Sequence, residues 1–363
     1  MSLKNRRRKL RQGLAEKEID AIFISQPENR RYLSGFDGSS GYLLITPQDT
    51  ILATDFRYLQ QAKIQAPDYE IFQIIGDIVD WFPRLVAELN MKKLGFEAGH
   101  ITFALHHQLS DILNKAQSQI RLIPVDGLVE SLRAIKEPEE IELITKAAEI
   151  SDAAVEYIEN MIHIGMSEKE IAWEVEKFTR ENGSETVPFE VIVASGPNSA
   201  LPHAKPSSRT IQSGEPVIFD IGARFGGYSS DLSRTICLDT PDDTFQKVYN
   251  TVLEAQLTAM ATIIEGMTGS EADNLVREII KQAGYDEAFG HALGHGIGLA
   301  SHESPRLGPN SADKLTSGMI FTIEPGIYLA GWGGVRIEDV VVMEDGKTRL
   351  ISKAKKLGDW HDN

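Results

Sequence analysis

The sequence has very little cysteine and no long run of hydrophobic residues. Of its 363 residues only Cys237 is a cysteine, so no disulfide can form within the chain and a reducing compartment suits it. No segment approaches the ~18 consecutive apolar residues of a membrane-spanning helix. No apolar run of signal-peptide length follows the basic N-terminal segment MSLKNRRRKL. We therefore expect a soluble protein of the cytoplasm.

Positive charge is also scarce. The chain has 37 Lys and Arg residues against 53 Asp and Glu residues, which gives a net charge of −16. Because so acidic a surface repels phosphate backbones and anionic lipids, we expect no nucleic acid and no membrane among its partners. Hydrophobic content of 42% and charged content of 25% are typical of a soluble globular protein. The excess acids are either an ordinary surface property or a sign that some carboxylates surround a cation.

The chain divides into two regions of different character. From residue 5 to about 125, short apolar runs alternate with helical patterns, which is typical of an α/β domain. The expected strands are 21–25, 42–46, 50–55 and 93–97, with helices at 56–65 and 78–90 between them. Lys136-Glu137-Pro138 then places proline at a helix start, with acids in the first turn. We predict an N-terminal domain at residues 1–130 and a second domain at residues 131–363.

The second region contains an internal repeat. Gly165-Met166-Ser167 aligns with Gly266-Met267-Thr268, an offset of 101 residues (266 − 165). In each copy a capped helix ends at a glycine, after a long helix (139–161 and 243–264) and before several strands. The repeat predicts two related halves around a shared sheet. Chance similarity over about twenty positions is the alternative interpretation.

Four acidic residues lie in apolar runs that we expect to be strands. Asp220 and Asp231 belong to the first half of the repeat, and Glu324 and Glu338 to the second. Asp is rare in strands and a buried unpaired carboxylate costs several kcal/mol, so each acid requires a partner. Four converging carboxylates cannot all stay ionised without cations. The pattern therefore predicts two divalent metal ions, with a neutral histidine completing the set of ligands.

Four histidines beside glycine or proline are candidates for this site: His203, His291, His295 and His302. They all fall within the second region of the chain. The remaining histidines are interpreted as surface or core residues: His100, His106, His107, His163 and His361.

Six short strings occur in one order along the second region: FDIGA, YSSDLSRT, GHGIG, HESP, TIEPGIY and VRIED. In these strings, and along essentially its whole length, the chain resembles the Xaa-Pro peptidases of the creatinase/prolidase/methionine aminopeptidase superfamily. The resemblance implies an α/β (α+β) protein with a creatinase-like N-terminal domain. It also implies a C-terminal catalytic "pita-bread" domain with a pseudo-twofold repeat.

The resemblance also implies which residues bind metal. Asp231 and Glu338 resemble the residues that bridge two ions, Asp220 resembles the ligand of one ion, and His295 and Glu324 those of the other. Oxygen-rich ligation with one imidazole favours Mn²⁺, with Co²⁺, Fe²⁺ and Zn²⁺ as alternatives. Glu324 is in addition the expected carrier of the proton from the nucleophile to the leaving proline nitrogen. The alternative is that these carboxylates are structural and paired with Lys or Arg.

Three histidines resemble residues that contact the substrate. His203 resembles the family histidine that contacts the peptide beyond the scissile bond. His302 resembles the one that hydrogen-bonds the scissile carbonyl or the tetrahedral oxyanion. His291 either lines the proline pocket or is a buried packing residue, and for His203 and His302 the alternative is likewise a hydrogen-bonded core histidine.

Three further residues are expected near the site. Arg336 alternates with Glu338 along a strand and so shares its face, where it could orient a metal-binding carboxylate. Tyr328 either borders the pocket or packs in the core. Arg306 is a candidate for reading a free C-terminal carboxylate, as in prolidases, although aminopeptidase-like members share this arginine.

The implied substrates are short peptides with proline at position two. We expect an Xaa-Pro aminopeptidase that removes the first residue, and the alternative is an Xaa-Pro dipeptidase (prolidase) restricted to dipeptides. A competing hypothesis of another class is a non-catalytic pita-bread protein that binds peptides. Because members of the family are commonly dimeric, the resemblance also implies a homodimer.

Overall fold

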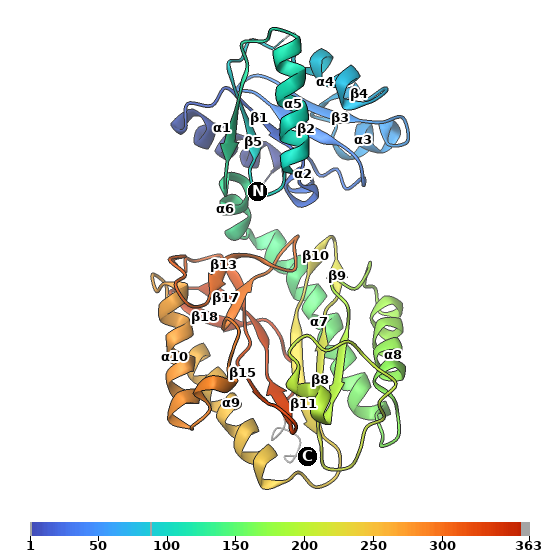
Figure 1. The fold of residues 1–363 in the computed structure, drawn as a ribbon, viewed down its shortest axis with the longest axis vertical. Helices are drawn as coiled ribbons and strands as arrows, with labels where there is room; N and C mark the ends of the chain where they lie inside the picture. Colours follow the sequence, from blue (N-terminus) through green and yellow to red (C-terminus); the bar gives the residue numbers. More distant parts are fainter. Residues whose placement is uncertain (1, 88, 357–363) are drawn as a thin grey trace. The chain divides into compact units, whose positions relative to one another are not determined.

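The computed structural model describes residues 2–87 and 89–356, so His361 lies outside the described residues. The chain separates into two compact units, Met1–Arg133 and Ala134–Asn363 (Figure 1). Among the described residues, no helix combines the length and the apolar character that crossing a membrane requires.

The first unit is built on a six-stranded mixed sheet in the order β4-β3-β2-β1-β5-β6. Strand β1 (Ala21–Ile24) pairs antiparallel with β2 (Tyr42–Ile45) and parallel with β5 (Lys93–Glu97). The remaining elements are β3 (Thr50–Thr54), β4 (Glu70–Gln73), β6 (Arg121–Val125), α1 (Leu3–Glu16), α2 (Pro27–Ser34), α3 (Leu59–Gln65), α4 (Ile78–Val86), α5 (Phe103–Lys115) and α6 (Leu128–Ala134). The mixed α/β character predicted for this part of the chain is confirmed.

The sequence predicted the inner strands of this sheet and missed its edges. β1, β2, β3 and β5 coincide with the expected apolar runs, because each is largely buried. β4 and β6 stand at the two edges of the sheet, and several of their side chains are exposed. An edge strand does not need a continuous apolar run. Its sequence therefore does not stand out from that of a loop.

The second unit consists of two halves, each of which begins with two helices and continues with strands. The first half contains α7 (Pro138–Met161), α8 (Glu168–Glu181), β7 (Ile192–Ser195), η1 (Gly196–Ala200), β8 (Pro216–Ile221), β9 (Arg224–Phe225), β10 (Tyr228–Ser229) and β11 (Leu232–Cys237). The second contains α9 (Asp243–Thr262), α10 (Gly269–Gln282), η2 (Asp286–Ala288), β12 (Gly294–Gly296), β13 (Glu303–Leu307), β14 (Ile320–Ile323), β15 (Gly326–Leu329), β16 (Gly333–Arg336), β17 (Asp339–Glu344) and β18 (Lys347–Leu350). Figure 1 shows the strands between the helix pair α7 and α8 and the helix pair α9 and α10.

The internal repeat is confirmed by the helix starts. Ser167 caps α8 and Thr268 caps α10, and each accepts a hydrogen bond from the backbone N–H of the glutamate three residues later. In both helices that glutamate returns a hydrogen bond to the cap residue, so both starts are complete capping boxes. The helices α8 and α10 therefore begin with the same local hydrogen bonds.

The backbone around each helix start confirms the repeat a second time. Gly165 N–H donates to Ile211 C=O (3.0 Å), and Gly266 N–H donates to Leu315 C=O (2.8 Å). The donors are 101 residues apart and the acceptors 104 (315 − 211), so the second half has gained three residues in between. The same offset of 104 relates Asp220 to Glu324, which makes these two acids equivalent members of the repeat.

The two halves meet where β11 lies beside β16. Glu338 N–H donates to Ser233 C=O (3.0 Å), and Arg234 forms a buried ion pair with Asp339 (2.7 Å). The Arg234 guanidinium also donates to the backbone carbonyls of Ala354 and Lys355, which follow the last strand of the chain. This one arginine therefore ties together strands of both halves and the segment beyond β18.

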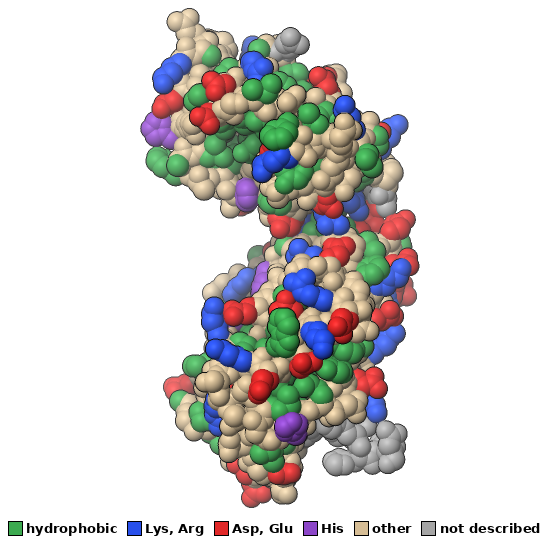
Figure 2. All heavy atoms as spheres, turned by 90° about the vertical axis from the view of Figure 1, so that its right-hand side faces the viewer, with side chains coloured by type: hydrophobic (Ala, Val, Ile, Leu, Met, Phe, Trp, Pro, Cys, Tyr) green, Lys and Arg blue, Asp and Glu red, His purple; other side chains and the backbone are tan. Residues whose placement is uncertain are grey.

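The excess of acids is largely a surface property. On the side of the second unit that carries α8, Lys and Arg side chains are interspersed with Asp and Glu side chains (Figure 2). Surface pairs such as Arg180 with Glu176 and Lys146 with Glu142 contribute little to stability because solvent screens them. The acids that need an explanation are the buried ones.

Gly269, the first residue of α10, is a position where alanine should not fit. A Cβ atom there would overlap the backbone carbonyl of Arg306. We expect Gly269→Ala to lower the free energy of unfolding by about 1–3 kcal/mol, since relieving the overlap requires β13 to move. Chemical denaturation would measure the change.

Gly290→Ala is the matched control, because no described heavy atom lies within 4 Å of a Cβ built at Gly290. A loss of stability confined to Gly269→Ala supports the contact. Equal effects of the two substitutions would contradict it.

Candidate metal centre

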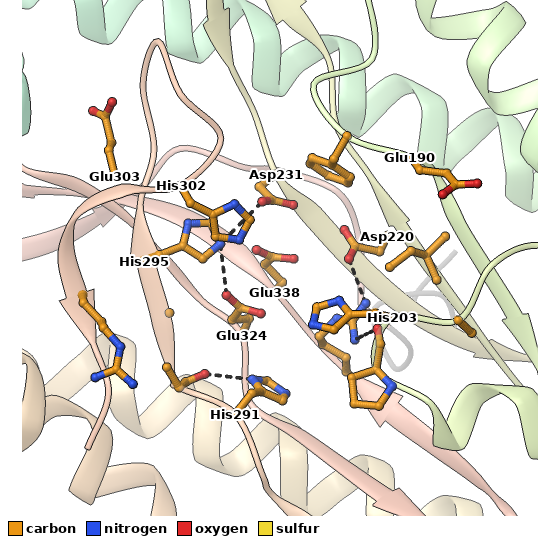
Figure 3. Close-up of a pocket in the computed structure, with 18 of the residues that line it drawn as sticks. Glu190, His203, Asp220, Asp231, His291, His295, His302, Glu303, Glu324 and Glu338 are labelled. Atoms are coloured by element: carbon orange, nitrogen blue, oxygen red, sulfur yellow. Dashed lines mark hydrogen bonds and ion pairs between the residues drawn. The ribbon is translucent and has the colours of Figure 1, made fainter. Parts of the chain in front are cut away.

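A pocket of about 640 Å³ in the second unit contains every residue that the sequence singled out except Tyr328, which lies beside it (Figure 3). The predicted residues that line it are His203, Asp220, Asp231, His291, His295, His302, Arg306, Glu324, Arg336 and Glu338. It is also lined by Phe189, Glu190, Ile192, Pro202, Ala204, Lys205, Ala292, Gly294 and Glu303. Residues that are up to 149 positions apart (338 − 189) thus meet in one cavity.

The four acids occupy special places in the strands. Asp220 lies within β8, as expected. Asp231 immediately precedes β11, while Glu324 and Glu338 lie in two-residue breaks between β14 and β15 and between β16 and β17. The expectation that all four lie inside strands is therefore wrong for three of them. Because these three acids lie outside the regular strand pairing, their side chains can point into the pocket. The backbone N–H of Glu324 still donates a hydrogen bond to the Leu293 carbonyl (2.9 Å).

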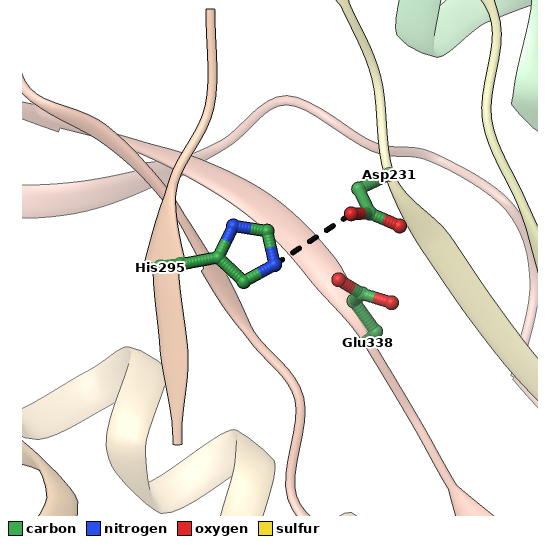
Figure 4. Close-up of side chains that lie close together, drawn as sticks. All are labelled: Asp231, His295 and Glu338. Carbon is green, nitrogen blue, oxygen red and sulfur yellow. Dashed lines mark ion pairs between the residues drawn. The ribbon is translucent and has the colours of Figure 1, made fainter. Parts of the chain in front are cut away.

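Asp231, His295 and Glu338 form the tightest group. One potential ligand atom from each lies within 4.8 Å of the other two (Figure 4). His295 Nε2 is 3.7 Å from Asp231 Oδ2 and 3.3 Å from Glu324 Oε1. The structure therefore brings three of the four expected carboxylate ligands close to the imidazole of the fifth expected ligand, His295.

Histidine at the centre of this group is a neutral electron-pair donor. Burial lowers the pKa of His295 to about 4. Its Nδ1 lies 3.1 Å from the Gly296 carbonyl oxygen, which can only accept, so Nδ1 carries the proton. Nε2 consequently directs its lone pair toward the carboxylates. A backbone carbonyl that orients a ligand imidazole in this way is typical of metal sites.

The carboxylates are destabilised in their charged form. Burial, and then the neighbouring carboxylates, raise the pKa of Asp231 and of Glu338 well above the usual range. Burial also raises the pKa of Glu324 to about 8. Positive charge is what would relieve this repulsion.

Asp220 is half satisfied by the protein. Its Oδ2 accepts a hydrogen bond from Arg336 Nη2 (2.8 Å), while its buried Oδ1 accepts none from the described residues. Together with the neutral imidazole and the crowded acids, this open acceptor makes the donor set fit divalent cations. Ion pairing with Lys or Arg, the alternative interpretation, applies to Asp220 alone among these four acids within the described chain.

Two hydroxyl groups that orient the acids were missed by sequence analysis. Ser233 Oγ donates to Glu338 Oε2 (2.8 Å) and accepts from Arg336 Nε (2.8 Å). Thr322 Oγ donates to Glu324 Oε1 (3.1 Å). Each lies two positions from an acid, on the same side of the chain. That spacing could have indicated the contact of Thr322 with Glu324, whereas Ser233 contacts Glu338, which lies 105 positions away (338 − 233) and which no local spacing indicates.

His291, Tyr328 and Arg336 form a hydrogen-bonded chain along one side of the pocket. His291 Nδ1 donates to the Ala292 carbonyl (2.8 Å), and burial lowers the pKa of His291 to about 4, so its Nε2 carries no proton. Tyr328 therefore donates its hydroxyl to His291 Nε2 (2.9 Å) and accepts from Arg336 Nη1 (2.9 Å). Neither ring nitrogen of His291 is left for a ligand.

His302 and His203 line the pocket on other elements. The His302 ring lies against the His295 ring, with ring centroids 3.9 Å apart and an angle of 31° between the ring planes, and burial lowers the pKa of His302. Glu303, the next residue, forms a buried ion pair with Lys136 (2.8 Å). Figure 3 shows His203 on the opposite side of the acids from His302.

Three exposed charged side chains line the pocket, and of these the sequence analysis singled out only Arg306. Glu190 and Lys205 form an exposed ion pair (3.0 Å), and Arg306 is also exposed, with Nη1 donating to the Pro309 carbonyl (2.9 Å). Glu190 has no pattern by which the sequence analysis could have found it. Lys205 lies two positions beyond His203, which was the one available indication for it.

Comparisons with known proteins agree with this architecture. A sequence profile of the Creatinase/Prolidase N-terminal domain matches residues 6–135, and one of Metallopeptidase family M24 matches residues 142–345. The Xaa-Pro dipeptidase of Pyrococcus furiosus is 37% identical over 361 residues, covering 98% of this chain and 100% of that protein.

Two solved structures are similar over nearly the whole chain. The Xaa-Pro dipeptidase from Bacillus anthracis superposes with a TM-score of 0.93 at 43% identity, covering 98% of this chain and 99% of that one. The X-Pro aminopeptidase from Thermotoga maritima superposes with a TM-score of 0.85 at 37% identity, covering 94% and 98%. The predicted two-part fold is confirmed by these likenesses.

Stripping metal with a chelator should lower the melting temperature, and more strongly at high pH. Burial raises the pKa of Glu324, Asp231 and Glu338 above their values in the unfolded chain. Without cations, the stability that their protonated forms contribute is fully present below the unfolded pKa and is lost as the pH rises through the folded pKa, near 8 for Glu324. Melting scans with EDTA and with Mn²⁺ from about pH 5.5 to about pH 8.5 test this. A gap between the two melting temperatures that stays constant with pH would contradict the prediction.

Proposed function

Because the chain belongs to metallopeptidase family M24, we propose that it hydrolyses the bond before proline when proline is the second residue of a short peptide. The observation that carries this proposal is the neutral imidazole among crowded, buried carboxylates inside a 640 Å³ pocket. A pocket of this size suits a few residues of peptide. The family match covers the part of the chain that holds every one of these ligands.

We propose that two divalent ions are held by Asp220, Asp231, His295, Glu324 and Glu338. When bound, the ions supply Lewis acidity for the scissile carbonyl and make water a stronger acid. The four carboxylates bring four negative charges, which two divalent cations balance. Oxygen-rich ligation supports Mn²⁺, with Co²⁺, Fe²⁺ or Zn²⁺ as alternatives. The homodimer and the cytoplasmic location stay predictions.

Glu324 is placed to move a proton. The proline nitrogen leaves as an amine only if it receives a proton as the bond to it breaks, because an amide anion is a very poor leaving group. Glu324 lies against His295 and is held by Thr322 at Oε1. We propose that it accepts the proton of the attacking water and delivers it to the proline nitrogen.

We propose a separate role in substrate binding for each of the three remaining histidines of the pocket. We propose that His302 donates a hydrogen bond to the scissile carbonyl oxygen, and that His203, across the acids, contacts the peptide beyond the scissile bond. His291 has both ring nitrogens engaged by Ala292 and Tyr328, so it offers only its ring surface. Such a surface suits the proline ring. Arg336 orients Asp220 directly and Glu338 through Ser233.

The length of peptide that the enzyme accepts depends on whether a side chain of the pocket binds the C-terminal carboxylate of the peptide. Arg306 lines the pocket with an exposed guanidinium, of which one nitrogen is used by Pro309. A free carboxylate of a dipeptide could bind the rest of it. The relatives named Xaa-Pro dipeptidase support this version, and the Thermotoga maritima relative named X-Pro aminopeptidase supports the version predicted from sequence.

Removing a metal ligand should abolish activity. We expect His295→Ala and Glu338→Gln to lower kcat/KM for Leu-Pro by more than about a hundredfold, because Lewis-acid stabilisation is worth several kcal/mol. Assays with added Mn²⁺, Co²⁺ or Zn²⁺ would measure it. His163→Ala, which changes an exposed histidine, should remain close to wild type. Retained metal-dependent activity in the ligand variants would overturn the ligand assignment.

Arg306 should matter for dipeptides and not for longer peptides. We expect Arg306→Ala to lower kcat/KM for Leu-Pro by about ten- to a hundredfold, the worth of a charge-assisted hydrogen bond. The value for Leu-Pro-Ala-Ala should change less than about twofold. Arg180→Ala, on the exposed face of α8, is the matched control.

The same assay separates the candidate activities. Cleavage of the longer peptide by the wild-type chain establishes an aminopeptidase. Cleavage of Leu-Pro alone establishes a dipeptidase. Cleavage of neither peptide, with metal bound, would leave the non-catalytic peptide-binding protein as the remaining hypothesis.

A further inference from the structure

Glu168, the first residue of α8, is a buried acid outside the pocket that the proposed mechanism does not use. Its side chain is fully buried and accepts hydrogen bonds from three residues of one loop. Ser195 donates from N–H (2.8 Å) and Oγ (2.8 Å), and Ser207 donates from N–H (2.9 Å) and Oγ (2.6 Å). Asn198 Nδ2 lies 3.1 Å from both carboxylate oxygens. One carboxylate therefore holds both ends of the loop.

The loop that it holds carries His203. His203 lies between Asn198 and Ser207, and the loop also supplies Pro202, Ala204 and Lys205 to the pocket lining. The backbone is fastened at the same place, because Lys169 N–H donates to the Ser207 carbonyl (3.1 Å). Fixing residues on both sides of His203 to one rigid helix start restricts where its imidazole can lie.

The repeat shows that this acid is not required to begin the helix. The equivalent position in α10 is Gly269, and α10 is capped in the same way as α8 without a carboxylate there. Gly269 instead packs against the backbone of Arg306. In both halves the helix start thus contacts a segment that lines the pocket: by a carboxylate to the loop of His203 in one, and by close backbone packing on strand β13 in the other.

Glu168 is ionised in this setting. Burial by itself would raise its pKa, but the hydrogen bonds from Ser207 and Ser195 lower the pKa of Glu168 below its usual range. An ionised carboxylate accepts at both oxygens and donates at neither. A neutral amide in its place would turn one NH₂ group toward donors of the loop.

We propose that Glu168 is a positioning residue, which holds the loop 195–207 so that His203 contacts the peptide substrate. The role of His203 in this inference rests on the proposed function. The claim that Glu168 fixes the loop rests on the hydrogen bonds alone. The substrate class is unchanged, since Glu168 acts only through His203.

The test is a double-mutant cycle between Glu168→Gln and His203→Ala with Leu-Pro as substrate. We expect Glu168→Gln to lower kcat/KM at least fivefold in the wild-type background and less than twofold when His203 is already alanine. Its split between kcat and KM should match that of His203→Ala. A fivefold loss that persists in the His203→Ala background would overturn the proposal.

Glu170→Gln is the matched control for the helix itself. Glu170 belongs to the capping box of the same helix and has no hydrogen bond to the loop among the described residues. It should leave kcat/KM within twofold of wild type. An equal loss in Glu170→Gln would show that the helix start, and not the carboxylate of Glu168, is responsible, which contradicts the proposal.

If the Glu168→Gln variant does not fold, a milder variant and a hydrogen-exchange measurement can still test the proposal. Ser207→Ala removes one donor and keeps the carboxylate, and we expect a smaller loss that also disappears in the His203→Ala background. Hydrogen exchange followed by mass spectrometry should show faster exchange at residues 196–209 in Ser207→Ala, with α8 unchanged. Unchanged exchange in that loop would contradict the hold on it.

These readouts separate the two proposals. If the wild-type chain cleaves no Xaa-Pro peptide, the proposed function fails, whereas the exchange measurement still decides whether Glu168 holds the loop. If the wild-type chain cleaves Leu-Pro and the cycle shows no coupling, only the positioning role of Glu168 fails.

Discussion

Repulsion among buried carboxylates is the constraint on which the rest of the site depends. Asp231, Glu324 and Glu338 are buried close together, where each negative charge raises the cost of the next. The surrounding groups meet this constraint in different ways. His295 is kept neutral by burial, Arg336 forms an ion pair with Asp220 alone among the four acids, and hydroxyl groups are the hydrogen-bond donors to Glu324 and Glu338. The protein therefore orients its acids without cancelling their charge, which leaves them for cations.

Much of this was visible in the sequence, for physical reasons that also explain the omissions. An acid in an apolar run stands out because burial of a charge is costly, so the four expected carboxylates could be singled out from the residues themselves. The choice of His295 among four candidate histidines came from the family resemblance, and the structure places it in the same pocket as the four acids. Edge strands such as β4 lack the apolar run of a buried strand and were missed. Ser233 and Thr322 resemble ordinary strand residues, and Glu168 resembles the acid that any helix start favours. Their partners lie up to 105 residues away (338 − 233), and local patterns carry no information about contacts at that distance.

The two halves of the second unit share backbone hydrogen bonds but differ in the side chains that they contribute to the pocket. Equivalent helix starts, with the same capping boxes, contact different segments of the pocket lining, namely the loop of His203 and strand β13 with Arg306. Asp220 and Glu324 occupy equivalent positions, yet one is paired with an arginine and the other with a threonine hydroxyl. A repeated backbone fold can thus place different side chains on the two sides of a pocket, as an asymmetric substrate requires. The repeat is conserved in its hydrogen bonds to the backbone and has diverged in its side chains.

The contacts of Arg234 have a consequence for how the site comes into being. This arginine, three positions after Asp231 of the first half, bonds to the backbone of Glu338 of the second half and to the carbonyls of Ala354 and Lys355. Lys356 in turn pairs with Asp339 (2.8 Å). During synthesis on the ribosome, these bonds cannot form until residues 354–356 have emerged. A nascent chain that carries only Asp220 and Asp231 therefore has no finished pocket, and the metal binding proposed for these acids would have to follow the synthesis of both halves.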